Sequence, residues 1–425
     1  AALIGKTNPR TGRPYGREIR IGLKTRALVD ARRERDILLG VIRKQEREAL
    51  GWSGTVEEAA ELAREIAPRN DEEKAAIEVG MGVVAKKILE PRIGPEKARQ
   101  WHKVVTGKAT PISTLAEKFM AECEGKKSRS YQNNFKTVLS ELLEFGGSFL
   151  TAEEVSRSLA ASFVTEFLPN RKSPKAPDGQ GPATIRKKVS NLAALWKWAQ
   201  KRGYLPYSKE TPWDEQAPDN AEVKAAAKKF RPFAPEETSK LLEAAPAGMV
   251  MGDIIRVALL TGVRLEEVAS LEASQVDPEA RWYEVREGKT DNASRIVPLV
   301  GFARHVILSR LRKATGDDRS LFPELGVRAS TGRKGGAVSQ GFTRLRRDVL
   351  GEHTDGELKQ HCFRHLWRTA ARRAGVDLRT AQEMGGWSRG KSSDLTYDHG
   401  EEVEHYIAEQ EKVWRWLQEK GYLGS

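Results

Sequence analysis

The sequence predicts a multidomain, mainly α-helical protein in which helical units precede an α+β unit with one small antiparallel sheet. At 425 residues the chain exceeds one ordinary hydrophobic core, so roughly two to four domains are expected. Apolar residues recur at helical spacing through most of residues 55–215. Two short strand patterns, "RWYEVREG" and "SRIVPLV", follow a polar, alanine-rich stretch.

Residues 1–50 are predicted to form a separate basic module. They contain a strand pattern, "REIRIGLKT", followed by a charged helix from about Ala27 to Glu48. This stretch carries 13 Lys or Arg residues against six Asp or Glu, in a chain whose formal net charge is +13. Such a surplus indicates an anionic partner, and it makes this module a candidate DNA-contacting region.

The remaining chain divides into four predicted parts. Residues 51–110 read as a helical spacer or extension, and residues 111–215 as a helical domain. Residues 216–230 read as a linker, and residues 231–425 as the α+β domain. In the helical domain an apolar stripe at i, i+4, i+7, i+11 and i+14 predicts the buried face of one helix: Ile185, Val189, Leu192, Trp196 and Ala199.

Cysteine content and hydropathy exclude several classes of protein. Cys123 and Cys362 are the only cysteines and lie far apart, so neither a disulfide framework nor a cysteine-based zinc site is expected. No apolar run approaches the length of a membrane span, and the first residues are too polar for a signal peptide. We therefore expect a soluble, cytoplasmic protein from a reducing compartment, with no membrane partner.

The segment "QHCFRHLWRTAARR", residues 360–373, contains two histidines and four arginines but no acidic residue. On a helix, the positions i, i+3, i+4, i+7 and i+11 lie along one face, and five cationic or protonatable residues occupy them: His361, Arg364, His365, Arg368 and Arg372. Like charges at this spacing repel, so the face suits an anion. A solvated basic surface is the alternative interpretation.

Further candidate residues are distributed over the same domain, and each alone has an ordinary structural explanation. Arg264 follows a glycine turn in "LLTGVRLEEVASL" and precedes Glu267 by three residues. Lys289 lies between the two strand patterns, where a flexible ammonium group could reach a cleft. Trp387 and Tyr397 belong to "MGGWSRGKSSDLTYDHG", in which Gly and Ser residues surround the tyrosine.

Taken together and in this order, these residues resemble those of the tyrosine recombinases, also called the phage integrases. The resemblance covers about 195 residues of the α+β part, and more loosely residues 111–215, which resemble the family's core-binding domain. It implies that the α+β part is the catalytic domain and that residues 1–50 resemble an arm-binding module. By the same resemblance the catalytic set is Arg264, Lys289, His361, Arg364, Trp387 and Tyr397, with Glu267 supporting Arg264.

The chain departs from the family pattern at a few positions. Cys362 stands where the family usually has Asp, which affects a supporting contact. Trp387 replaces the commoner His; its indole N–H can donate one hydrogen bond but cannot shuttle a proton. His365 is expected to pack structurally, and Tyr406 is a competing nucleophile candidate within the helical pattern of the tail.

The chemistry of phosphodiester cleavage explains why these residue types are needed. Arg264 and Arg364 can each donate two N–H groups to the phosphate and stay charged at any relevant pH. Tyrosine attacks poorly while protonated, so the resemblance implies that His361 serves as the base that activates Tyr397. Lys289 would then donate a proton to the departing 5′ oxygen, and Trp387 would add a hydrogen bond.

The sequence therefore predicts a site-specific DNA recombinase, such as the integrase of a phage or other mobile element. It would form a covalent 3′-phosphotyrosyl intermediate without metal, ATP or other cofactor, since no ligand spacing or phosphate-binding loop is present. Expected partners are double-stranded DNA, further copies of the chain in a tetramer, and accessory DNA-bending or directionality proteins. Alternatives are a type IB-like topoisomerase and a non-catalytic DNA-binding protein that retains the fold.

The tail "EVEHYIAEQEKVWRWLQEKGYL" has an apolar stripe at Val403, Ile407, Trp414 and Leu417, with Tyr406 and Val413 beside it. In the family, such a helix docks on a neighbouring subunit. Alternatively, it caps its own domain, and the sequence leaves both possibilities open.

Overall fold

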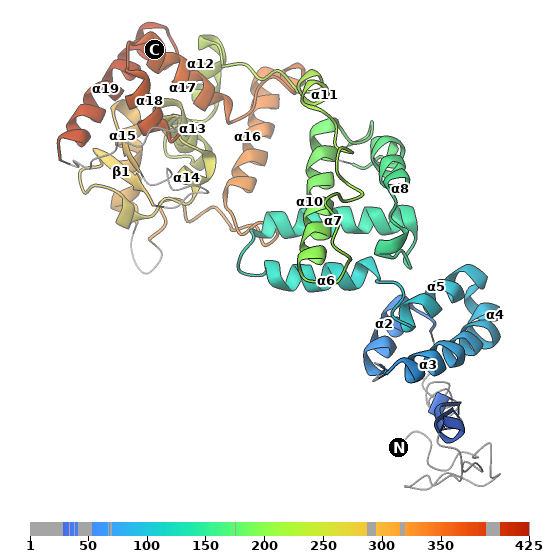
Figure 1. The fold of residues 1–425 in the computed structure, drawn as a ribbon. Helices are drawn as coiled ribbons and strands as arrows, with labels where there is room; N and C mark the ends of the chain where they lie inside the picture. Colours follow the sequence, from blue (N-terminus) through green and yellow to red (C-terminus); the bar gives the residue numbers. More distant parts are fainter. Residues whose placement is uncertain are drawn as a thin grey trace. The chain divides into compact units, whose positions relative to one another are not determined.

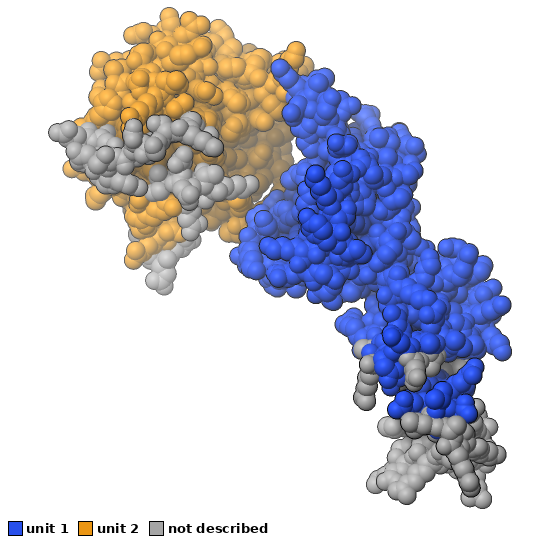
Figure 2. Space-filling view, viewed as in Figure 1, with its two compact units in different colours: residues 1–227 blue, residues 228–425 orange. Residues whose placement is uncertain are grey.

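The computed structural model describes residues 29–33, 35–37, 39–40, 53–66, 68, 70–174, 176–286, 295–314, 319–387 and 400–424. They fall into two compact units, residues 1–227 and 228–425 (Figures 1 and 2). Of the basic module, the described residues between 29 and 40 are helical, in the range predicted for its helix. The strand predicted before that helix lies outside the described residues. No helix in the described part of the chain is long and apolar enough to span a membrane.

The first unit contains a small helical bundle that follows the basic module. Its elements are α2 (Val56–Glu65), α3 (Asp71–Val84), the π-helix η1 (Ala85–Leu89), α4 (Glu90–Ile93) and α5 (Pro95–Val105). Thr55 and Asn70 begin α2 and α3 by accepting hydrogen bonds from backbone N–H groups of the first turn, as N-cap residues do. Trp101 is fully buried in a core that includes Leu62 and Leu89, so residues 53–109 form a hydrophobic cluster, to which Phe149 also belongs.

A second helical cluster in the first unit occupies residues 112–225. Its elements are α6 (Ile112–Cys123), α7 (Arg129–Gly146), the 3₁₀-helix η2 (Ala152–Glu154), α8 (Arg157–Ser162), the π-helix η3 (Phe163–Phe167), α9 (Leu168–Asn170), α10 (Pro182–Lys201) and α11 (Asn220–Ala225). The five residues predicted as the apolar stripe of α10 are all buried, so that prediction is confirmed. Helix α11 lies within the stretch predicted as a linker. The predicted domain boundaries stay predictions.

The second unit is mostly helical with one small sheet in its described residues. Its elements are α12 (Pro235–Ala244), α13 (Val250–Thr261), α14 (Leu265–Ala269), the 3₁₀-helix η4 (Ala273–Gln275), β1 (Trp282–Val285), β2 (Arg295–Pro298), α15 (Gly301–Lys313), α16 (Gly335–Leu350), the 3₁₀-helix η6 (Glu352–Thr354), α17 (Cys362–Arg373), α18 (Leu378–Gly385) and α19 (Gly400–Glu419). Strands β1 and β2 pair antiparallel, with Trp282 opposite Pro298 and Val285 opposite Arg295. The predicted fold class, mainly α with a small antiparallel sheet, is confirmed.

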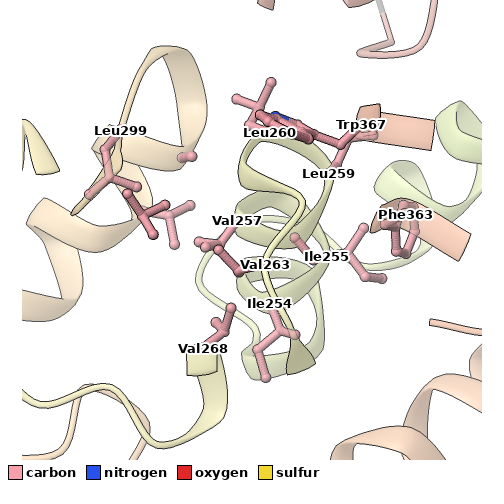
Figure 3. Packing of buried hydrophobic residues seen from close by; sticks show 14 of the residues in the cluster. Ile254, Ile255, Val257, Leu259, Leu260, Val263, Val268, Leu299, Phe363 and Trp367 are labelled. Carbon is pink, nitrogen blue, oxygen red and sulfur yellow. The ribbon is translucent and has the colours of Figure 1, made fainter. Parts of the chain in front are cut away.

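Helix α13 forms the centre of the second unit. Nine of its twelve residues are buried, and α14, α15, α17 and α19 all pack against it. Figure 3 shows Ile254, Ile255 and Val257 of this helix among side chains from other elements, including Leu299 and Phe363. A helix that is largely apolar and buried over most of its surface is stable only when other elements surround it. Because the surrounding elements hold α13 in place, the backbone of the turn at its C-terminal end is also held in place, and side chains near that turn have a fixed starting position.

Helix α19 packs against its own unit, on α13, α17 and β2. Its buried residues are Tyr406, Glu409, Gln410, Val413 and Leu417, whereas Val403, Ile407 and Trp414 of the predicted stripe are only partly buried. Gln410 is one of the buried residues because its side chain accepts a hydrogen bond from the Trp367 indole N–H, at 3.2 Å, and donates to the Leu260 carbonyl. A polar side chain that is satisfied by hydrogen bonds can be buried, which an apolar pattern does not reveal.

Candidate active site

Arg264 lies at the N-terminus of α14, two residues after the turn that ends α13. That turn is made by Gly262, whose φ of 62° is the left-handed conformation that terminates many helices. The Arg264 guanidinium donates to Glu267 Oε1 at 2.8 Å and to the Gly386 carbonyl at 3.0 Å. Its side chain nevertheless remains 47% exposed. Arg264 is thus fixed in orientation but open to a ligand.

Arg364 lies on α17 and, unlike Arg264, is buried, with 4% of its surface exposed. Its Nη1 donates to the Gly262 carbonyl at 2.7 Å, so the same turn that precedes Arg264 also holds Arg364. Burial, followed by the positive charges of Arg264 and Arg295, lowers the pKa of the Arg364 guanidinium to about 9. The group therefore stays protonated at neutral pH, although its charge is held less readily than in water.

Of the five cationic or protonatable residues predicted along one face of this segment, four are exposed and one is buried. His361, His365, Arg368 and Arg372 are exposed, whereas Arg364 lies at the border of the helix face that packs on the core. The five positions span a wide enough arc for one member to be buried. His365, which was expected to pack structurally, is exposed.

His361 immediately precedes α17, and its ring meets the ring of His365 edge-on at 5.1 Å between centroids. The residue keeps solvent access. Burial of its ring by surrounding protein atoms, followed by the charges of His365 and Arg364, lowers the pKa of His361 to about 4. An imidazole with such a pKa is neutral at pH 7 and can accept a proton.

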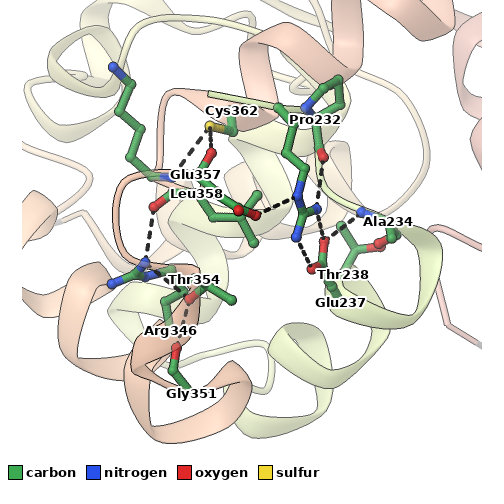
Figure 4. A network of polar contacts seen from close by, with 12 residues as sticks. Pro232, Ala234, Glu237, Thr238, Arg346, Gly351, Thr354, Glu357, Leu358 and Cys362 are labelled. Carbon is green, nitrogen blue, oxygen red and sulfur yellow. Dashed lines mark hydrogen bonds and ion pairs between the residues drawn. The ribbon is translucent and has the colours of Figure 1, made fainter. Parts of the chain in front are cut away.

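A network of polar contacts fixes the turn that carries His361 (Figure 4). The Cys362 Sγ accepts a hydrogen bond from the Lys359 backbone N–H at 3.3 Å and donates to the Glu357 carbonyl at 3.7 Å. The buried Arg346 donates to the Leu358 carbonyl at 3.2 Å. Cys362 is itself fully buried, which raises the pKa of its thiol. It therefore acts as a neutral hydrogen-bonding group within the turn.

Trp387 covers Arg364. The centroid of its ring lies 4.1 Å from the Arg364 guanidinium carbon and 5.3 Å from that of Arg368. The Trp387 ring also stacks on the indole of Trp367, with 5.8 Å between the ring centroids and an interplanar angle of 26°. Both arginines are within the range of a cation–π interaction. The predicted hydrogen bond from the indole N–H to a phosphate stays a prediction.

Lys289 and Tyr397 lie outside the described residues, so their predicted roles stay predictions. Lys289 falls in the chain between β1 and β2, and Tyr397 falls between Trp387 and α19. The competing candidate, Tyr406, is buried in α19, and its hydroxyl donates to Glu383 Oε2 at 2.8 Å. Tyr406 is therefore a packing residue with a satisfied hydroxyl.

Arg295, the first residue of β2, is a further residue of the site that was not predicted from the sequence. Its side chain is 6% exposed and pairs with Glu267, Nη2 to Oε2 at 2.7 Å and Nη1 to Oε1 at 3.3 Å. Burial alone would raise the pKa of the Glu267 carboxyl, but the contacts with Arg295 and Arg264 leave this pKa below its ordinary value. Glu267 is thus an ionised carboxylate shared by two arginines. The sequence around Arg295 does not indicate that this arginine pairs with Glu267, which lies far away in the chain.

Two regions of the chain match models of known protein families. Residues 232–403 match the model of the phage integrase family, and residues 112–212 match that of the phage integrase SAM-like domain. Together these matches span well over half of the chain.

Two curated relatives are tyrosine recombinases named XerC. The protein from Corynebacterium glutamicum is 25% identical over 240 residues, 52% of this chain and 69% of its own length. The protein from Haemophilus influenzae is 27% identical over 148 residues, 34% of this chain and 48% of its own length. The match thus spans about half the length of the second relative.

Solved structures with a similar fold include the Tn1549 transposon integrase in complex with a circular intermediate DNA and a lambda integrase tetramer bound to a Holliday junction. Each has a TM-score of 0.50 and 15% identity and covers 71% of this chain, with 95% and 85% of the respective solved chains matched. This likeness concerns the fold. The two family models and the curated relatives lead to one conclusion: the chain belongs to the phage integrase family, the tyrosine recombinases.

Proposed function

We propose that this protein is a site-specific DNA recombinase that cuts and rejoins DNA strands through a covalent 3′-phosphotyrosyl intermediate. One observation carries the proposal. Arg264 and Arg364, 100 residues apart in the sequence, are both tied to the turn at Gly262 and are both linked to the residues around Gly386 and Trp387. The charge of Arg264 disfavours the charged form of Arg364, and a phosphate group bound beside both would relieve that repulsion.

The proposed reaction begins with attack of the Tyr397 hydroxyl oxygen on the scissile phosphorus. The neutral His361 accepts the phenolic proton as the new P–O bond forms. The bond between phosphorus and the 5′ oxygen breaks, and Lys289 donates the proton that the departing oxygen needs. Strand joining reverses these steps, since a free 5′ hydroxyl attacks the phosphotyrosine and releases the phenol.

Arg264 and Arg364 have different tasks in this proposal. Arg264 is half-exposed and oriented by Glu267, so it can bind the phosphate as the DNA arrives. Arg364 is buried under Trp387, so we assign its charge to electrostatic stabilisation of the phosphate and not to first contact with the DNA. Losing one preorganised donor to such a transition state typically costs about 3 to 4 kcal/mol.

Double-stranded DNA and further copies of the chain are the proposed partners. Integrases of similar fold have been solved on DNA, one of them as a tetramer on a Holliday junction. The positive charge of residues 1–50 supports contact with additional DNA. Accessory DNA-bending or directionality proteins belong to the proposal through the family resemblance alone.

The test is capture of the covalent intermediate on DNA that has been selected by the protein from a random-sequence library. A nicked substrate that loses its 5′ fragment should trap the wild-type protein as an adduct that survives denaturation. Tyr397→Phe should give no adduct, whereas Tyr406→Phe should still react. If Tyr397→Phe also forms the adduct, the nucleophile is another residue; if wild type binds DNA but forms none, the protein is a non-catalytic binder.

A topoisomerase would form the same adduct, so a second measurement is needed. Exchange of strands between two selected sites indicates a recombinase. Relaxation of supercoiled DNA by a monomer, without exchange between sites, would identify the protein as a topoisomerase instead.

A further inference from the structure

Arg295 connects three separate elements of the second unit. From the start of β2 its guanidinium donates to both oxygens of Glu267 on α14. Its Nε donates to the Met384 carbonyl on α18 at 3.0 Å. The next turn, at Gly386, approaches the same guanidinium so closely that a Cβ on Gly386 would lie 2.7 Å from Cζ of Arg295. One side chain thus fixes β2, α14 and the end of α18 relative to one another.

Glu267 transmits the position of Arg295 to Arg264. Its Oε1 accepts from Nη1 of both arginines, and its Oε2 accepts from Nη2 of Arg295 and from the Arg264 backbone N–H at 2.9 Å. A carboxylate with hydrogen bonds on both oxygens has little freedom to rotate. If Arg295 were absent, the carboxylate would lose its buried partner and could no longer hold Arg264 in one orientation.

The contacts on α18 extend the effect to Trp387. The Gly386 carbonyl accepts from Arg264 Nη2 at 3.0 Å, and Trp387 is the next residue in the chain. Arg295 also holds the Met384 carbonyl, which lies two residues before Gly386. It therefore fixes the backbone from which the Trp387 side chain extends. The ring of this side chain lies over Arg364. Arg264, Trp387 and, through the latter, Arg364 therefore depend on one buried guanidinium.

We propose that Arg295 is a positioning residue for DNA cleavage: held between Glu267 and the Met384 carbonyl, it sets the geometry of Arg264 and Trp387 around the scissile phosphate. The proposal rests on the recombinase function proposed above. Arg295 is not a catalytic residue, because its side chain is 6% exposed and is directed at Glu267 and α18. Its effect should therefore appear in the rate of cleavage and not in the affinity for DNA.

The test compares Arg295→Lys with a matched control, Arg310→Lys. Arg310 belongs to the same unit, is 8% exposed and likewise bridges a buried carboxylate, Asp253 at 2.7 Å, and a backbone carbonyl, that of Leu321 at 3.1 Å. Single-turnover cleavage of the nicked substrate, DNA affinity and melting temperature are measured for both. We expect cleavage to slow at least tenfold in Arg295→Lys and less than threefold in Arg310→Lys. DNA affinity should change less than threefold in either.

A second measurement asks whether Arg295 acts through Arg264. Independent effects multiply, whereas residues acting through one another do not. In an Arg264→Lys background, the further change Arg295→Lys should slow cleavage less than it does alone, because only its effect through Trp387 remains. A full tenfold additional loss would overturn the positioning role, as would equal slowing in Arg295→Lys and Arg310→Lys.

Failure of Arg295→Lys to fold and absence of cleavage in the wild-type protein have different meanings. If Arg295→Lys does not fold, the pair Arg295→Met with Glu267→Gln removes both buried charges and should fold, since such pairs can often be replaced by neutral groups. This double variant should bind DNA but cleave at least tenfold more slowly; wild-type cleavage by it would overturn the inference. Absence of cleavage in the wild-type protein would instead contradict the proposed function itself.

Discussion

The indole ring of Trp387 lies over the guanidinium of Arg364, with 4.1 Å between the ring centroid and the guanidinium carbon. This contact joins the residue that precedes the Tyr397 segment to the buried arginine of α17. If Trp387 takes the position that the resemblance assigns to it, where histidine is commoner, this contact gives the tryptophan a role there. A flat aromatic ring covers the charge and stabilises it in a way that does not require proton transfer.

The first prediction concerns this covering ring. Trp387→Ala removes the cation–π contact and the stacking on Trp367, and we expect it to lower the free energy of unfolding by about 1 to 3 kcal/mol. Trp387→Phe keeps an aromatic ring over Arg364 and should cost less than half as much. Urea unfolding of both variants measures the difference. Equal losses would mean that the ring contributes no specific interaction with Arg364.

The second prediction concerns pH. The pKa of His361 is about 4 in the folded protein, below the ordinary histidine value near 6.5 that applies to the unfolded chain. Between these values the unfolded chain binds more protons, so stability is complete above about pH 6.5 and declines as the pH falls towards 4. Because His361 keeps solvent access, screening limits the loss to about 1 kcal/mol or less.

Urea unfolding at pH 5 and pH 7.5 provides the measurement, with His361→Gln as the control. The variant should lose less stability than wild type over this interval. For the same reason, the cleavage rate should not require deprotonation of a histidine between pH 6 and pH 8. A rate limb near pH 6.5 that disappears in His361→Gln would show that the pKa is not depressed.

A third prediction follows from the turn at Gly262. A Cβ at this position would lie 2.6 Å from Cγ of Trp367, and φ is 62°. We expect Gly262→Ala to destabilise the protein by about 2 to 4 kcal/mol, from backbone strain and overpacking together. Gly375 also has a positive φ, 78°, but a Cβ there meets no atom within 4 Å. Gly375→Ala should therefore cost only about 1 kcal/mol, which isolates the contribution of the clash.

The fourth prediction concerns residues 1–50. If this basic module binds DNA, its deletion should flatten the salt dependence of binding, with the log–log slope falling by about 0.9 for each phosphate that the module neutralises. Binding of the full chain and of the shortened chain is measured over a range of salt concentrations. The same slope for both chains would mean that residues 1–50 do not neutralise DNA phosphates.

Much of the fold could be predicted because it depends on local patterns. The stripe of α10 and the two strands β1 and β2 were predicted from periodicity within single segments, and the structure confirms them. The tail was less predictable. Its buried face includes Gln410, which is buried because Trp367 and Leu260 supply hydrogen-bond partners from distant elements. Removing α19 would expose that core, so truncation after Gly400 tests stability before it can test assembly.

The candidate site was predictable as a set of residue types but not as an arrangement. Arg264, His361, Arg364 and Trp387 were selected together from the order in which they occur. The burial of Arg364 under Trp387 could not be predicted, because it depends on contacts between α17 and the end of α18. Arg295 was missed for the same physical reason: its role exists only through a carboxylate 28 positions earlier and a carbonyl 89 positions later.

The lowered pKa of Arg364 has a consequence for the evolution of this protein. The folded chain holds that charge less readily than water does, and the contacts of the guanidinium with the Gly262 carbonyl and the Trp387 ring offset that cost. A methionine at the same position would fill the space without the charge but would leave both partners without the guanidinium, so its melting temperature weighs the two effects against each other. If Arg364 has the proposed role in cleavage, the presence of a buried charge at this position records selection for activity beside selection for stability.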